Sequence, residues 1–208
     1  MKLFKSLLTL CAILLIGWPA FGANCGDGVG ACACGDTLTA SYTLPGDLAC
    51  TNSGNALNIG ANDVVLNLGG YTISGDSTNV KEAIYSDGYD GLEIRGPGTI
   101  TDTEGIKVYS GDGTVITGLT ITNAIDVDSD DGGNDAIYIG QAEGAQPANV
   151  EISSNIIGTQ GSADDITRQG IAVVACDTVE ISDNTIYGGR IGIDIEPNAT
   201  RPGSDFSI

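Results

Sequence analysis

The segment GIAVVACDTVEISDNTIYGGRIGIDIEPN, residues 170–198, contains a repeating pattern of short strands. Apolar and polar residues alternate over residues 170–173 and again over residues 179–181, and the first pattern restarts at Gly192. Alternation with a period of two residues is typical of β-strands that have one buried face. The segment therefore predicts a repeat that is built from β-strands.

The same repeat extends through most of the chain. Its first strand begins at six places, which are Ala56, Ala83, Gly105, Ala136, Gly170 and Gly192. This spacing of about 20 to 35 residues is typical of solenoids, in which one unit cannot bury its apolar face without a stacked neighbour. Stacking would bring together two inward columns, one of Ile84, Ile106, Ile137, Ile171 and Ile193, and one of Ser86, Val108, Ile139, Val173 and Ile195.

These columns predict an all-β fold, a right-handed parallel β-helix of about six rungs, because crossovers between parallel strands are right-handed. A β-sandwich of short hairpins is the alternative, since it also has many strands and glycine-rich turns. A sandwich does not require the same residue at the same phase in successive repeats, so the solenoid is the better interpretation.

Three regions are expected along the chain. Residues 1–23 have two lysines, a short apolar run and then small residues, as in a secretory signal peptide. Residues 24–55 form a cysteine-rich N-terminal cap, and residues 56–208 form the β-helix, which is either a fragment of a longer chain or covered by a partner at its last rung. No apolar run is long enough to span a membrane after signal cleavage.

The cysteines of the cap predict disulfides. In an exported chain, four cysteines in 32 residues indicate two bridges. We expect Cys25 to pair with Cys32 and Cys34 with Cys50, because a bridge between Cys32 and Cys34 would be strained. A metal site is the alternative, but the chain has no histidine. Cys176 is expected to be a buried thiol.

The order of the motifs resembles a known superfamily. CGDTLTASYTLPGDLAC is followed by LNIGANDVVLNLGGYTISG, by the GIxV and VEISxNxI rungs and by GIDIEPN. This arrangement resembles the secreted right-handed parallel β-helix proteins of the pectate-lyase-like superfamily and covers nearly all of the mature chain. The resemblance implies a fold and a secreted, periplasmic or cell-surface location, but the superfamily includes many activities.

The outward strand positions predict a binding surface. Tyr85, Lys107, Tyr138 and Asp194 fall into one outward column, and Tyr109 and Glu196 into the next. Aromatic rings beside hydrogen-bonding groups suit a sugar chain, so these tyrosines with Asp194 and Glu196 are the candidate substrate-binding residues. The alternative is that tyrosine simply suits exposed strand positions.

An acidic insertion before the Ala136 strand predicts a calcium site. Its oxygen-bearing side chains are Asp126, Asp128, Asp130, Asp131 and Asp135, with Asn134. Carboxylates on a glycine-bearing loop are the ligands that Ca²⁺ prefers. The sequence does not fit an EF-hand, because Asp131 occupies the position of its glycine. A solvated acidic turn is an equally good interpretation.

The composition limits the partners. The chain has 27 acidic and 8 basic residues, a formal charge of −19, which disfavours nucleic acid and anionic lipid. We expect an exported protein that binds polysaccharide or serves as a cell-surface module. One alternative is a calcium-dependent uronate lyase with Lys107 as base, by resemblance to pectate lyases, whose arginine-containing motif is missing here. The other is a structural segment of a larger adhesin-like chain.

Overall fold

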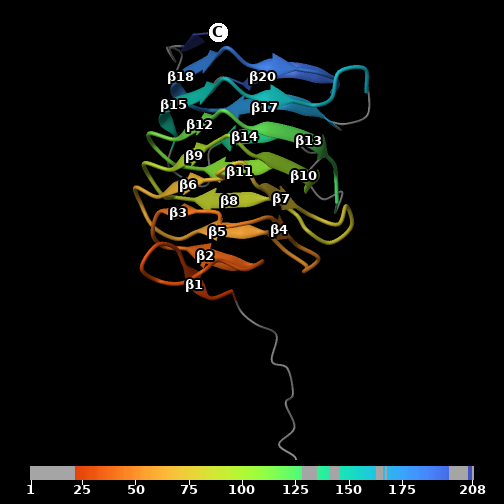
Figure 1. Cartoon of the computed structure of the whole chain (residues 1–208). Coiled ribbons are helices and arrows are strands. Elements are labelled where there is room, and N and C mark those ends of the chain that lie inside the picture. The colour runs from red at the N-terminus through yellow and green to blue at the C-terminus, as the bar shows by residue number, and fades with distance from the viewer. Residues whose placement is uncertain are drawn as a thin grey trace, which may run out of the picture.

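The protein is a stack of parallel β-coils. A computed structural model describes residues 22–127, 135–140, 146–162, 166, 168–196 and 206–207. Every regular element among these residues is a β-strand, and none of them belongs to a helix that could cross a bilayer. The coils stack from β1 (Asn24–Cys25) at one end to β20 (Ile191–Glu196) at the other, as Figure 1 shows. The predicted parallel β-helix is confirmed.

Three parallel sheets run along the stack. The eight-stranded sheet contains β1, β2 (Asp36–Leu38), β5 (Leu57–Ile59), β8 (Ile84–Asp87), β11 (Ile106–Tyr109), β14 (Ile137–Gly140), β17 (Gln169–Val174) and β20. The seven-stranded sheet contains β3 (Tyr42–Thr43), β6 (Val65–Asn67), β9 (Glu93–Arg95), β12 (Val115–Thr117), β15 (Ala148–Ser153), β18 (Asp177–Ser182) and β21 (Phe206–Ser207). The six-stranded sheet contains β4 (Leu48–Ala49), β7 (Thr72–Ser74), β10 (Thr99–Thr103), β13 (Thr120–Ala124), β16 (Ile156–Ile157) and β19 (Thr185–Ile186).

The chain visits the three sheets in the same order in every coil. Six successive coils, from β2–β4 to β17–β19, have a strand in each sheet. The sequence identified the first two strands of each repeat but not the third, in the six-stranded sheet. β4, β16 and β19 have only two residues and show no detectable alternation, whereas β10 and β13 have five residues each and do alternate, so their pattern was available in the sequence.

The core consists of columns of aligned apolar side chains. Ile106 pairs with Ile84 on one side and with Ile137 on the other, and Ile171 continues the column to Ile193. Ile84, Ile106, Ile137 and Ile171 are fully buried. The predicted inward register is therefore confirmed. A matching isoleucine column, Ile73, Ile100, Ile121 and Ile157, fills the core from the six-stranded sheet.

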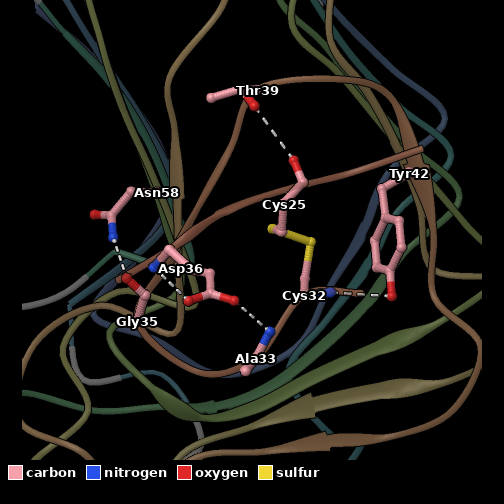
Figure 2. The surroundings of a disulfide bond; sticks show 9 residues. Cys25, Cys32, Ala33, Gly35, Asp36, Thr39, Tyr42 and Asn58 are labelled. Atoms are coloured by element: carbon pink, nitrogen blue, oxygen red, sulfur yellow. Dashed lines mark hydrogen bonds between the residues drawn. A yellow bond between two sulfur atoms is a disulfide. The ribbon is translucent and has the colours of Figure 1, made fainter. Parts of the chain in front are cut away.

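Both predicted disulfides of the cap are present. Cys25 is bonded to Cys32 and Cys34 to Cys50, whereas Cys176 is a free, buried thiol. Figure 2 shows the first bridge, where the Cys32 backbone N–H donates to the Tyr42 hydroxyl at 3.2 Å. Two disulfides are typical of a protein from an oxidising compartment.

The cap segment is also part of the stack. It contributes β1 to β4, and β2 pairs directly with β5. Asp36 links two backbone segments of the cap. Its carboxylate accepts hydrogen bonds from the backbone N–H groups of Ala23 and Ala33, each at 2.8 Å. The stack thus begins before Ala56, where the sequence placed its first strand. The difference arises because these first strands have only two or three residues.

Two stacked asparagines hold the turns that follow β15 and β18. The Asn155 carboxamide donates to the Ile116 carbonyl of the coil before it at 3.0 Å and also contacts the Asn184 carboxamide of the coil after it. Asn184 in turn donates to the Ile152 carbonyl at 2.7 Å. These bonds satisfy backbone groups at a corner where no strand ladder is available.

Candidate functional site

A groove of about 300 Å³ lies on the outer face of the eight-stranded sheet. It extends over β11, β14, β17 and β20 and over the residues that precede the first three of these strands. Six of the residues singled out from the sequence line it, namely Lys107, Tyr109, Asp135, Tyr138, Asp194 and Glu196. The sequence did not identify Glu104, Arg168 and Gln169, which also line it.

The outward columns have the predicted register. Lys107 pairs with Tyr85 on one neighbouring strand and with Tyr138 on the other. The column then continues through Ala172 to Asp194. Parallel pairing places equivalent residues at intervals of about 4.8 Å, so these side chains form a line along the stack.

Three tyrosines form an aromatic cluster at one end of this line. The ring centroids of Tyr85 and Tyr109 are 6.1 Å apart, and those of Tyr109 and Tyr138 are 5.4 Å apart. Both pairs meet edge to face, with interplanar angles of 66° and 61°, which is a favourable aromatic geometry. Tyr85 does not line the groove itself but supports Tyr109, which does.

The Tyr138 ring lies against the backbone of its own strand. A Cβ atom at Gly140 would be 2.4 Å from the ring and from its hydroxyl, so only glycine at this site leaves room for the ring where it lies. Burial, and then the neighbouring Tyr109, raise the pKa of Tyr138 to about 12. The phenol therefore stays protonated and can donate a hydrogen bond in the groove.

Lys107 is held by a carboxylate from the preceding coil. Its Nζ lies 2.8 Å from Glu82 Oε1, and both side chains are largely buried, with exposed fractions of 20% and 7%. Burial acts to lower the pKa of Lys107, but its hydrogen bond to Glu82 and the charge of that carboxylate outweigh burial and raise it. A stabilised ammonium has no free electron pair, so this arrangement does not favour Lys107 as a base.

Asp135 belongs to the groove. It is 5% exposed, its Oδ1 accepts the Gln169 backbone N–H at 3.1 Å, and its Oδ2 lies 3.8 Å from Arg168 Nη1. Burial is the main cause that raises the pKa of Asp135 to about 6, and Asp194 adds to it. The Gln169 N–H, Arg168 and Lys107 oppose this increase.

Gln169 contacts both Asp135 and Asp194 in the groove. It is 3% exposed, and its Nε2 donates to Asp194 Oδ2 at 2.9 Å. Among the residues that the structure describes, nothing donates to its buried Oε1. Since a carboxylate only accepts hydrogen bonds, the contact with Asp194 fixes which end of the carboxamide is the oxygen.

A polar column lies at or just before the start of β8, β11, β14 and β17. Glu82, Glu104, Asp135 and Gln169 each stand two residues before one of the aligned isoleucines, and all four are buried. The strands expected from the sequence begin one residue after these positions, so their alternation does not include the column. The repeat could have revealed the column, because each of its residues lies two positions before the aligned isoleucine of its coil, which is Ile84, Ile106, Ile137 or Ile171.

The predicted calcium ligands fall into two groups. Asp128, Asp130 and Asp131 lie outside the described residues. Asp126 and Asp135 are described, but in that part of the chain no three His, Cys, Asp or Glu side chains gather where they could hold a metal ion. The calcium site remains a prediction.

Comparisons with known proteins do not extend these observations. Neither the family models, nor the curated proteins, nor the solved structures include a match to this chain.

Proposed function

We propose that the outer face of the eight-stranded sheet binds a carbohydrate chain. The observation that carries this proposal is the cluster of edge-to-face tyrosines beside a polar groove on the same face. Aromatic rings pack against the apolar faces of sugars, while carboxylates, amides and ammonium groups bind sugar hydroxyls. The groove offers both kinds of contact.

The dimensions of the surface suit a polymer. From Tyr85 to Asp194 the outward column takes four steps between coils, each of about 4.8 Å, so it is about 19 Å long. That length accommodates several sugar units in line with the stack. A disulfide-bonded chain is also suited to the extracellular setting in which polysaccharides are met.

The lyase alternative has less support. It requires a base near the bound sugar, and the sequence offered Lys107 for that role. The ion pair of Lys107 with Glu82 at 2.8 Å keeps its ammonium protonated. We therefore propose Lys107 as a hydrogen-bond donor to the ligand.

Affinity electrophoresis of the purified protein in gels that contain polysaccharides tests the proposal. A binding polymer should slow migration, and Tyr109→Ala should weaken binding about tenfold, which corresponds to about 1.4 kcal/mol. Tyr71→Ala is the matched control, because Tyr71 is an exposed tyrosine that does not line the groove. Equal loss in both variants, or no retardation of the wild type by neutral, acidic or basic polymers, would contradict the proposal.

A further inference from the structure

The groove has more negative than positive charge. Its lining contains four carboxylates, Glu104, Asp135, Asp194 and Glu196, and two cations, Lys107 and Arg168. Both cations already have a carboxylate neighbour. Lys107 is paired with Glu82, which lies outside the lining, and Arg168 lies 3.8 Å from Asp135. A ligand that enters the groove therefore meets a net negative field.

A buried acceptor in the groove lacks a donor among the described residues. Gln169 lines the groove, and its Nε2 is engaged by Asp194, whose side chain stands on the outward column. Its Oε1 has no hydrogen-bond partner among the described residues. Since an unpaired buried acceptor costs free energy, the groove floor is suited to a ligand that brings a hydrogen-bond donor.

The two observations point to the same chemical group. A primary ammonium has three donors and no acceptor, so it can satisfy Gln169 Oε1 and the nearby Asp194 together. It also balances the charge, and the faces of Tyr109 and Tyr138 attract cations. A uronate would add negative charge to this surface, and a hydroxyl would leave the charge uncompensated.

We propose that the groove binds a polysaccharide with free amino groups, of the kind formed by glucosamine units, and that Asp194 and Gln169 hold one ammonium. This inference rests on the proposed carbohydrate-binding function and names its ligand class. N-acetylation of the amine removes both the charge and two of the donors. The acetylated sugar should therefore lose the contact and keep only the aromatic and hydroxyl contacts.

The test compares two ligands that differ only in the amine. Titration calorimetry near pH 6.5 would measure binding of a β-1,4-linked glucosamine oligomer and of its N-acetylated counterpart of equal length. We expect the amino oligomer to bind at least tenfold tighter, and this preference to shrink when the salt concentration is raised. A galacturonate oligomer should not bind without calcium.

Variants separate the ammonium contact from the general charge. Asp194→Asn and Glu196→Gln should each weaken binding of the amino oligomer more than binding of the acetylated oligomer, so the preference for the amino oligomer should shrink. Glu180→Gln removes one charge from the exposed face of β18, on the seven-stranded sheet, and should change neither affinity. Melting curves of each variant would show that the fold is retained.

The outcomes distinguish the inference from the function on which it rests. Equal binding of the two oligomers, or tighter binding of the acetylated one, would overturn the ammonium site and leave carbohydrate binding intact. Equally tight binding of a lysine oligomer would overturn the glycan assignment, because it would show attraction to any polycation. Failure of every sugar to bind would overturn both proposals.

Discussion

The buried carboxyl of Asp135 should make the stability of the protein depend on pH. Its pKa is about 6 in the folded protein, against a reference value of 3.8. The difference of about two units corresponds to about 3 kcal/mol. Because the folded-state pKa is raised, the protonated carboxyl is the form that folding favours. The contribution is complete below pH 3.8 and is lost as the pH rises through 6.

Substitution of Asp135 by Asn isolates this contribution. Asparagine keeps the shape and polarity of the protonated carboxyl but cannot ionise. Relative to the variant, the wild type should therefore lose most of this contribution, about 2.5 kcal/mol of unfolding free energy, between pH 4 and pH 7. Urea denaturation at intervals of one pH unit would measure both proteins, and the change in their difference cancels the titration of all other groups.

Two results would refute this reasoning. A difference between wild type and Asp135→Asn that stays constant within about 0.5 kcal/mol from pH 4 to pH 7 would show that folding does not perturb this carboxyl. A difference that grows in favour of the wild type as the pH rises would show that the ion pair with Arg168 outweighs burial. Glu180→Gln serves as the control for loss of one exposed negative charge.

Three further predictions concern the core, the cap and the acidic loop. The Ser86 hydroxyl is fully buried without a partner among the described residues, so Ser86→Ala should raise the unfolding free energy by about 1 kcal/mol in urea titrations. The Cys34–Cys50 bridge closes 16 residues, so replacement of both cysteines by alanine should cost about 3 kcal/mol, and no loss would show that the cap folds without it. If the acidic loop binds calcium, saturating calcium should raise the melting temperature, and Asp128→Asn combined with Asp130→Asn should abolish the increase. An equal increase in that double variant would place the calcium elsewhere.

The sequence predicted the columns well because residues at the same position of successive repeats become neighbours when parallel strands stack. Once Ile106 and Ile137 occupy the same position of successive repeats, parallel pairing aligns them and also aligns Lys107 with Tyr138. The alternation within each strand then assigns one residue to the core and the next to the surface. Short strands such as β16 could not be predicted in this way, because two residues are too few to show alternation.

The walls of the groove were harder to predict. Arg168 and Gln169 stand at the end of a long insertion, where the path of the chain decides which way a side chain points. The Lys107–Glu82 contact joins different coils, so it cannot be read from either coil alone. Asp135 was grouped with the acidic loop because of its neighbours in sequence, whereas its burial and its contacts with Gln169 and Arg168 place it in the groove.

Because the isoleucine columns are uniform, they do not by themselves fix which coil packs against which during folding. Ile106, Ile137 and Ile171 present the same side chain at the same position, so a coil that docked one place too far along would bury an equivalent surface. The hydrogen bonds of Asn155 to Asn184 and of Gln169 to Asp194 each join one particular pair of neighbours. A misplaced coil would leave the buried amides of Asn155 and Gln169 without these partners, which costs free energy. The polar pairs thus favour the native register of the coils over a shifted one.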